Sequence, residues 1–532
     1  MKITARNGWF LGRHTALSPA RTMLAVFVLF LILDVEALMA DSTPAPRSAN
    51  RGQYGVRWKV IENEAVDYYL PCERIEDAKG LSPKHFDRIF PWSHIKLCNI
   101  AKRSGKIAYK SDRGFALDGS KGNVMVEIPK HYSKRYIRDG YEYRLISAKP
   151  RSGFIVDPAF VENGRTLEKI YVGAYEAHIS PDGKMESVSG VYPTADRTRI
   201  EYREFARANG AGYGIFDMRT LFMIQNLFLI EHADRNSQKA IGNGWGKILQ
   251  PARTHRCALA EKGVNRLVTT CDPAKTEADM LRGLFIGCAI QITSYEKPGT
   301  VYHTGRSLTR VALNSPKAGL ASIHFDGDPI DTTTDMCLGG AAQKTGWADK
   351  VTGHSGHGAY NGGPPEEEYR CAVKYRHMEN LWGNVWCFID GVNLSNGRAF
   401  FCENMNDYES GVTANTYKPV EIAQLLQDDN GDIGGDREIH YLGNLGYDPH
   451  QPWLALPQDY TFQGKSSVPG ASASLRNGNF GDYYYLNTKA TCYVHGGGFD
   501  HYWRCGLFTL RGWATDSAKW YLYGSRLIFK AM

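Results

Sequence analysis

The sequence lacks the short patterns that identify several large groups of enzymes and metal sites. No CxxC, GxSxG or HExxH occurs in its 532 residues, so zinc ribbons, thioredoxin-type sites, common serine hydrolases and zincins have no support. No basic run occurs either, and 63 basic residues are balanced by 56 acidic ones, which gives a formal charge of +7. The charge pattern therefore predicts no nucleic-acid partner.

The sequence also has no apolar run long enough to cross a membrane. The longest candidate, residues 23–33, has about half the length that a spanning helix requires. Basic residues precede it, so residues 1–40 are predicted to be a signal peptide, which would make the protein secreted or place it at a cell surface. The alternative is a mis-assigned leader, with Met39 as the true start.

The number of cysteines, eleven, is odd and leaves at least one thiol unpaired. Cys257 with Cys271 and Cys387 with Cys402 have hairpin-like separations and could form disulfides if the protein is exported. Scattered buried thiols explain the same cysteines equally well.

A chain of this length predicts more than one domain. Many glycines and tyrosines with few amphipathic helical patterns favour strands, turns and long loops. We expect a linker over residues 41–55, a β-rich N-terminal attachment region over 56–165 and a C-terminal domain over 166–532.

Four elements can be placed from local patterns. Strands are expected over residues 124–128, ended by Pro129, and over 170–179. The clearest helix covers residues 218–233, with Asp217 as its N-cap and apolar side chains at helical spacing. A shorter helix is expected over residues 199–207.

The last forty residues are dense in aromatic and charged side chains. Such side chains combine buried area with a polar tip and dominate binding energies at interfaces. Apolar neighbours such as Leu507, Phe508 and Leu522 need burial, so the stretch should divide into a scaffold and a presented face. The predicted ligand-binding residues are Asp500, His501, Tyr502, Trp503, Arg504, Arg511, Trp513, Asp516, Lys519, Trp520, Tyr521 and Tyr523.

Gly383-Asn384-Val385-Trp386, followed at a distance by Gly496-Gly497-Gly498 and a terminal Gly524-Ser525-Arg526-Leu527, resembles the formylglycine-generating enzyme (sulfatase-modifying factor) family. That resemblance implies an elaborated C-type-lectin-like fold. In the pattern, a strand glycine would let another backbone approach while tryptophans anchor the core.

A wider resemblance covers nearly all of the chain after the leader. It is carried by short motifs in order, which include Ile89-Phe90-Pro91-Trp92, residues 124–130, residues 171–176, Ser189-Gly190-Val191-Tyr192-Pro193 and residues 481–485. Together they are similar to phage tail proteins with a C-type-lectin-type receptor-binding end, including variable proteins of diversity-generating retroelements. The resemblance implies phage tail components as partners and a homotrimer as one form. It places Asp500, His501 and Tyr502 at variable positions, and a start at Met39 would then fit a virion tail.

The oxidase activity of the first family needs two cysteines just after the Gly-Gly strand, because a thiolate pair suits Cu(I). Only Cys505 lies there, and Cys387 follows the GNVW motif, where the family usually has an acidic residue. Both departures weaken the prediction of an oxidase.

An acidic run offers the one candidate metal site. Asp428, Asn430 and Asp432 could bind calcium, which takes six to eight oxygen ligands. A turn without an ion is the alternative, so no cofactor is expected unless calcium binds here.

The sequence thus predicts an α+β protein with a C-type-lectin-like C-terminal domain and no enzymatic activity. It would bind a protein or glycan receptor on a cell surface through a C-terminal face. The alternatives are an exported formylglycine-generating-enzyme-like oxidase and a structural phage tail component.

Overall fold

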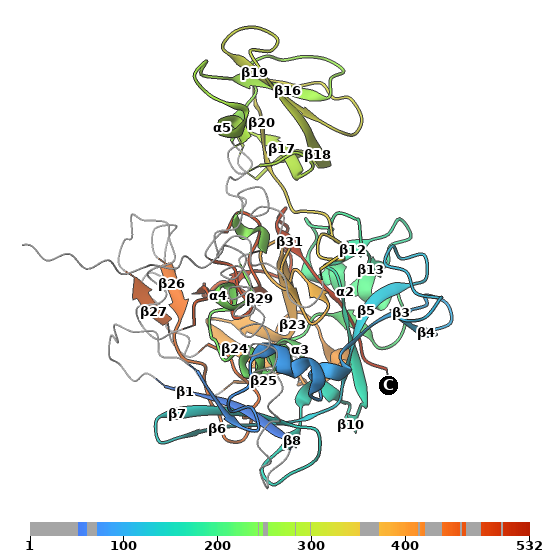
Figure 1. Ribbon diagram of the computed structural model, residues 1–532, viewed down its shortest axis with the longest axis vertical. Coiled ribbons are helices and arrows are strands. Elements are labelled where there is room, and N and C mark those ends of the chain that lie inside the picture. The colour runs from blue at the N-terminus through green and yellow to red at the C-terminus, as the bar shows by residue number, and fades with distance from the viewer. Residues whose placement is uncertain are drawn as a thin grey trace, which may run out of the picture. The chain divides into compact units, whose positions relative to one another are not determined.

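A computed structural model describes residues 52–60, 72–242, 244–247, 254–281, 284–297, 299–351, 372–412, 415–420, 439–457, 460–463, 480–501 and 504–531. The described chain is β-rich with few helices, 37% strand against 13% helix, and its sheets and helices are drawn in Figure 1. The predicted signal peptide and most of the predicted linker lie outside the described residues. Strand β1 already begins at Gln53, inside the range expected for the linker.

The first sheet is antiparallel and has the order β2-β1-β7-β6-β8. Its strands are β1 (Gln53–Lys59), β2 (Glu73–Glu76), β6 (Tyr132–Arg138), β7 (Tyr141–Ser147) and β8 (Ile155–Val156). Side chains alternate between its two faces, so Trp58 and Arg144 point into the core while Arg57 and Tyr136 remain partly exposed.

The second sheet places the last strand of the chain among strands from its first half. Its order is β14-β32-β11-β5-β3-β4, with β3 (Lys96–Ile100), β4 (Ile107–Tyr109), β5 (Asn123–Pro129), β11 (Lys169–Gly173), β14 (Tyr213–Ile215) and β32 (Leu527–Phe529). The expected boundary between residues 165 and 166 therefore lies between two paired strands, β5 and β11. Residues 52–532 form one compact unit.

Helix α3 (Met218–His232) packs against β1 and β7 on one side and β23 on another. Asp217 accepts a hydrogen bond from the Thr220 amide, and the helix ends at Ala233 in a left-handed conformation. Helix α2 (Arg199–Arg207) begins at Thr198, which forms a capping box with Glu201. Both predicted helices, and the predicted cap at Asp217, are confirmed.

An inserted six-stranded sheet has the order β15-β20-β17-β18-β19-β16. Its elements are β15 (His255–Arg256), β16 (Arg266–Thr270), α5 (Glu277–Leu281), β17 (Ala289–Ser294), β18 (Val301–Leu313), β19 (Leu320–Phe325) and β20 (Met336–Gly340). The Ala258 amide donates to the Val268 carbonyl over 2.7 Å, and Leu259 bridges to Val268. This contact joins the two edges of the sheet, so the insert closes into a small barrel.

The last large sheet carries most of the C-terminal sequence and has the order β25-β24-β23-β29-β30-β28, with β31 parallel to β23. Its strands are β23 (Trp386–Ser395), β24 (Arg398–Phe401), β25 (Lys418–Pro419), β28 (Tyr484–Leu486), β29 (Cys492–His495), β30 (Leu510–Ala514) and β31 (Tyr523–Gly524). Leu507, Phe508 and Leu522 are buried beneath it, as predicted.

Shorter elements complete the described chain. They are β9 (Val161–Glu162), β10 (Arg165–Thr166), β12 (His178–Ile179), β13 (Met185–Glu186), α4 (Ser237–Ala240), β21 (Lys374–Tyr375), β22 (Met378–Glu379), β26 (Ile439–Leu442), β27 (Tyr460–Gln463) and the 3₁₀ turns η1 (Pro83–Arg88), η2 (Trp92–His94), η3 (Pro158–Phe160), η4 (Gly244–Lys247) and η5 (Met405–Asp407). Within the described ranges, no helix is both long and apolar enough to traverse a bilayer.

Two expectations from the sequence need correction. The strand expected over residues 170–179 is interrupted after Gly173. The Ala174 amide still donates to Val124 of β5, but the Ala174 carbonyl accepts from the Glu379 amide and the Tyr175 amide donates to Ser187 Oγ. Strand pairing resumes only at β12.

The two possible disulfides are not formed, and their four cysteines are free thiols: Cys257, Cys271, Cys387 and Cys402. Each thiol instead contacts a carbonyl oxygen one or two residues further along the chain. The alternative explanation, scattered buried thiols, holds for three of these four cysteines. The fourth, Cys387, is half-buried.

Candidate binding face at the C-terminus

Strand β30 presents two of the predicted ligand-binding residues on its outer side. Leu510, Gly512 and Ala514 point inward and are buried, while Arg511 and Trp513 alternate with them and point outward. Trp513 is 45% exposed, a large fraction for the largest apolar side chain. The pattern of β30 therefore keeps an arginine and an indole side by side at the surface.

Arg511 is surrounded by aromatic rings from four segments of the chain. Its guanidinium carbon lies 5.0 Å from the ring centroid of Trp513, 5.7 Å from Trp386, 5.8 Å from Tyr485 and 5.9 Å from Trp520. A cation within about 6 Å of a ring centroid is attracted by the negative face of the ring. The four rings thus fix the position of one positive charge.

Next to this cluster, His501 contacts both Trp386 and Trp520 edge to face, with ring centroids 5.2 Å and 6.0 Å away. Its Nδ1 lies 2.5 Å from Oδ1 of Asp500. The Tyr521 hydroxyl donates to the other carboxylate oxygen of Asp500 over 3.5 Å. Burial, followed by the nearby Asp500 carboxylate, raises the pKa of Tyr521 above its usual value, so the phenol stays protonated.

Arg504 extends the surface in the other direction. Its guanidinium carbon lies 5.5 Å from the Tyr483 ring, and Tyr483 in turn stacks on Tyr485 with centroids 6.3 Å apart. We define the C-terminal face as Asp500, His501, Arg504, Arg511, Trp513, Trp520 and Tyr521, which rest on the buried rings of Trp386, Tyr483 and Tyr485.

The three buried rings beneath this face are not among the predicted ligand-binding residues. The sequence predicts Trp386 as a core anchor, and it is fully buried. Tyr483 and Tyr485 belong to a motif of the wider resemblance. The alternation in residues 483–485 is the signal that could have identified the tyrosines, because residues two apart share one face of a strand. Tyr485 lies opposite Arg511 in the pairing of β28 with β30.

Two other predicted residues, Asp516 and Tyr523, are held by the scaffold, and Lys519 makes an ion pair at the surface. Asp516 pairs with the fully buried Arg199 over 2.5 Å and accepts a hydrogen bond from Thr491. Lys519 pairs with Glu201 over 3.1 Å, and Tyr523 is buried in β31. The remaining two predicted residues, Tyr502 and Trp503, lie outside the described part of the chain.

Glycines let the face sit close to the strand below it. Gly496 has a φ of +91°, and a Cβ there would lie 2.7 Å from the Leu381 carbonyl oxygen. The Gly383 amide approaches the carbonyls of Gly496 and Gly497 at 3.3 Å and 3.2 Å, and Trp382 and Trp386 are both fully buried. The two glycine motifs therefore meet as backbones, flanked by tryptophans that anchor the core.

Asp482 supports the face from beneath. Its carboxylate accepts a hydrogen bond from the Phe508 amide over 2.6 Å and contacts the Ser237 hydroxyl. Burial raises the pKa of Asp482 to about 8, because the charged form is poorly solvated there. A mostly neutral carboxyl group therefore holds the loop between β29 and β30 at neutral pH.

Cys505, the residue closest to the position of the oxidase cysteines, is also part of this scaffold. Its Sγ is fully buried and contacts the Gly498 carbonyl at 3.2 Å. Burial raises the pKa of the Cys505 thiol well above its usual value, which disfavours the thiolate that a soft metal binds. No group of three or more potential metal ligands occurs among the described residues, and the predicted calcium residues Asp428, Asn430 and Asp432 lie outside them.

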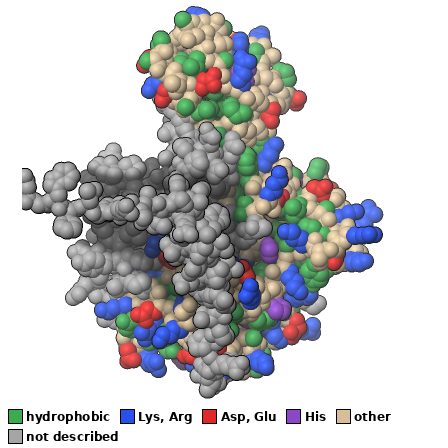
Figure 2. All heavy atoms as spheres, viewed as in Figure 1, with side chains coloured by type: hydrophobic (Ala, Val, Ile, Leu, Met, Phe, Trp, Pro, Cys, Tyr) green, Lys and Arg blue, Asp and Glu red, His purple; other side chains and the backbone are tan. Residues whose placement is uncertain are grey.

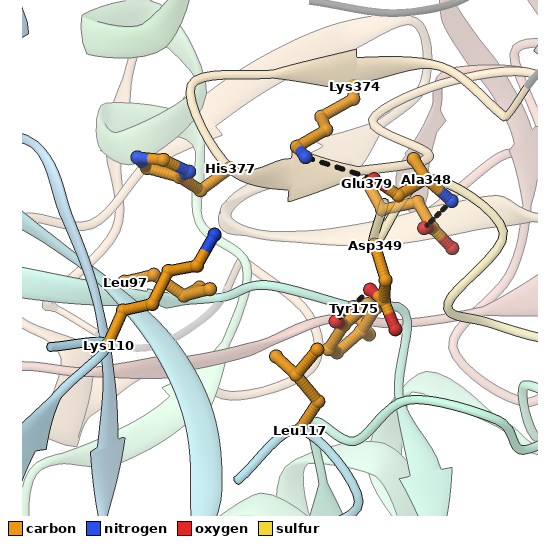
Figure 3. Close-up of a pocket in the computed structure, with 9 residues that line it drawn as sticks. All are labelled: Leu97, Lys110, Leu117, Tyr175, Ala348, Asp349, Lys374, His377 and Glu379. Atoms are coloured by element: carbon orange, nitrogen blue, oxygen red, sulfur yellow. Dashed lines mark hydrogen bonds between the residues drawn. The ribbon is translucent and has the colours of Figure 1, made fainter. Parts of the chain in front are cut away.

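A separate pocket lies between the second sheet and the β21–β22 hairpin (Figure 3). It is lined by Leu97, Lys110, Leu117, Tyr175, Ala348, Asp349, Lys374, His377 and Glu379, and its volume of about 20 Å³ has room for about one water molecule. Figure 3 shows Tyr175 turned to Asp349 and Glu379 turned to the Ala348 amide.

The ionisable groups of this pocket are largely satisfied by the protein. Burial, helped by Lys374 and Lys110, lowers the pKa of His377 to about 4, and burial raises the pKa of Glu379 to about 8. Lys374 donates to two carbonyl oxygens, those of Ala348 and Val351. The small volume of this pocket and the contacts among its own residues make the pocket a packing feature rather than a ligand site.

On the face drawn in Figure 2, basic and acidic side chains are interspersed over the described surface. The C-terminal face is distinguished by the aromatic rings around Arg511.

No protein-family model matches this chain, and a search of curated proteins finds no match either.

Proposed function

We propose that this protein is a non-enzymatic receptor-binding protein whose C-type-lectin-like C-terminal domain presents the C-terminal face to a ligand on a cell surface. The observation that carries the proposal is the outward pair on β30: Arg511 enclosed by rings, next to the exposed Trp513. Aromatic and arginine side chains in such clusters supply most of the energy at binding interfaces.

The construction of the face supports binding over oxidation. Its glycine motifs, the buried Asp482 and the ion pair between Asp516 and Arg199 fix the scaffold. The outward residues touch one another and leave Trp513 exposed. A rigid base with rigid aromatic groups costs little entropy on binding, because few side chains have to be ordered. In contrast, the one cysteine near the oxidase position is buried and protonated.

In this proposal the β-rich N-terminal part attaches the protein to a larger assembly, such as a phage tail, and the chain could act as a homotrimer. Residues of the C-terminal face could then vary between related proteins while the glycine scaffold stays constant. A secreted or cell-surface form follows if residues 1–40 are a genuine signal peptide, and a virion tail protein follows if Met39 is the start.

The test is binding of the labelled full-length protein to a panel of intact cells and immobilised glycans. Trp513→Ala should reduce binding to any positive target about tenfold or more, since hot-spot aromatic residues contribute at least this much. Ile155→Ala, at a residue that is 42% exposed in β8, is the matched control and should bind normally. Equal binding by the two variants would contradict the proposal.

A further inference from the structure

Arg511 differs from three enclosed arginines of the scaffold. Arg199, Arg203 and Arg219 each pair with a carboxylate, over 2.5 Å to Asp516, 2.7 Å to Asp390 and 2.8 Å to Glu162. Among the residues that the structure describes, Arg511 makes no ion pair, and its buried Nε has no hydrogen-bond acceptor. Its charge is balanced only by the faces of four rings.

An arginine held in this way is prepared for an anion. The surrounding rings restrict the side chain before any ligand arrives, so the entropy of ordering it has already been lost during folding. Arg511 as a whole is half-buried while its Nε is enclosed, which leaves the terminal nitrogens as the groups that can reach a ligand. The guanidinium fork matches two oxygens of a carboxylate or of a phosphate. One cation balances the single charge of a carboxylate, whereas a phosphate monoester carries roughly two charges.

The neighbouring side chains limit what carries this carboxylate. The Trp513 indole is 45% exposed and lies 5.0 Å from the guanidinium carbon, so the ligand must offer an apolar face within about one ring width of its charge. On the other side of the cluster, His501 and Asp500 are 11% and 10% exposed, and their Nδ1 and Oδ1 atoms are buried against each other. Their remaining polar atoms are the groups that can form hydrogen bonds with hydroxyls. A saturated ring with an apolar C–H face, several hydroxyls and one carboxylate is a sugar acid in its pyranose form.

We propose that the C-terminal face binds a carboxylate-bearing sugar, with its carboxylate on Arg511 and its ring against Trp513. This inference rests on the proposed receptor-binding function and names the ligand class for the same site. Both hexuronic acids and sialic-acid-type sugars have the required chemistry, and the experiment distinguishes them.

The experiment measures binding of the full-length protein to two immobilised oligosaccharides, one containing a hexuronic acid and one ending in a sialic acid. Each is compared with the same oligosaccharide after reduction of its carboxyl group to an alcohol. An acidic peptide and the panel of intact cells are included as further arms. We expect binding to one of the two sugar acids and at least a tenfold loss when its carboxyl group is reduced.

Two variants then locate the contact. Arg511→Lys keeps the charge and loses the fork, and it should weaken binding to the acidic sugar about tenfold. Arg398→Lys, at an exposed arginine at the start of β24, is the matched control and should bind normally. If Arg511→Lys unfolds the protein, as judged by thermal melting, the carboxyl-reduced sugars still test the inference without any variant.

The outcomes separate the two claims. Binding that is unchanged by carboxyl reduction, binding to the acidic peptide alone, or unchanged affinity of a folded Arg511→Lys protein would each overturn the sugar-acid inference. Binding to cells without binding to either sugar acid would overturn this inference and leave the receptor-binding proposal standing. Absence of binding in every arm would overturn both.

Discussion

The outer face of the first sheet and the C-terminal face are made of the same kinds of residue but differ in how their charges are balanced. In the first sheet, Glu73, Arg57, Tyr143 and Tyr136 lie opposite one another on four successive strands. Arg57 pairs with Glu73 over 2.7 Å and contacts the Tyr143 hydroxyl at 3.4 Å, and the two tyrosine rings stack at 4.6 Å. Each group in this row has its partner in the next strand.

The C-terminal face lacks such a regular ladder. The rings around Arg511 come from β23, β28, β30 and the segment before β31, and Arg511 has no carboxylate among its described neighbours. Aromatic and cationic residues can therefore complete a sheet surface or leave a charge ready for a ligand. The difference comes from the partners that the fold supplies.

Raising the pH from about 5 to about 8 should lower the free energy of unfolding through Asp482, the carboxyl group beneath the C-terminal face. This is the largest effect that we expect. Burial raises the pKa of Asp482 to about 8, compared with about 4 in an unfolded chain. Between these values the folded state binds more protons, so the free energy of unfolding falls as the pH rises, by at most about 5 kcal/mol from this group. Urea unfolding at several pH values gives the free energy of unfolding of the wild type and of Asp482→Asn. The free energy of unfolding should depend less steeply on pH in the variant.

The first sheet provides the control with the opposite sign. Burial opposes ionisation of Glu142, but Arg135 and Arg144 outweigh it and hold the pKa of Glu142 below its usual value. The contribution of Glu142 to the free energy of unfolding is present above its unfolded pKa of about 4. It is lost as the pH falls through the lower pKa that Glu142 has in the folded state. Glu142→Gln should therefore reduce the loss of stability in acid and leave the slope between pH 5 and pH 8 unchanged. Identical slopes for Asp482→Asn and the wild type would contradict the role given to Asp482.

Gly496→Ala should cost about 3 kcal/mol in the free energy of unfolding. The change forces a side chain into a positive φ and places a Cβ 2.7 Å from a backbone oxygen, and each of these costs about 1 to 2 kcal/mol. Gly140→Ala is the matched control in the hairpin between β6 and β7, since its φ is +72° but no atom lies within 4 Å. It should lose only about 1 kcal/mol. Equal losses in chemical denaturation would show that the backbone approach at Gly496 is unimportant.

Asp516→Asn should cost about 2 kcal/mol, because it leaves the buried Arg199 with one fewer negative partner. The comparison is Glu73→Gln, which removes the carboxylate from Arg57 at the edge of the first sheet, where both side chains are at least one third exposed. That change should cost less than about 1 kcal/mol. A double-mutant cycle for each pair measures the two coupling energies. A small coupling energy between Asp516 and Arg199 would mean that Asp516 is available to bind a ligand.

The smallest effect on stability is expected for Trp513→Ala, at less than about 1 kcal/mol, because nearly half of this side chain is already exposed. Tyr143→Ala in the first sheet removes a ring that is 7% exposed and should cost about 3 kcal/mol. Thermal melting measures both changes. A loss of stability by Trp513→Ala as large as that by Tyr143→Ala would make Trp513 a structural residue.

Local patterns gave correct helices where the signal was complete within a few residues. Asp217 caps α3 and Thr198 caps α2 because capping depends on side chains and amides three positions apart. The strand expected over residues 170–179 was wrong after Gly173, since hydrogen bonds with Glu379 and Ser187 redirect the backbone there. The two cysteine pairs were compatible with disulfides by spacing, and only the three-dimensional structure shows free thiols.

By itself, the sequence determined that the last forty residues contain a scaffold and a presented part, because apolar residues there need burial and aromatic residues with polar tips can sit at a surface. Only the tertiary structure decided which residues belong to which part. It gave Asp516 and Tyr523 to the scaffold and placed the buried rings of Trp386, Tyr483 and Tyr485 beneath the arginines of the face. The reason is physical: the environment of a charge or ring depends on neighbours from distant strands, and no local pattern specifies those neighbours.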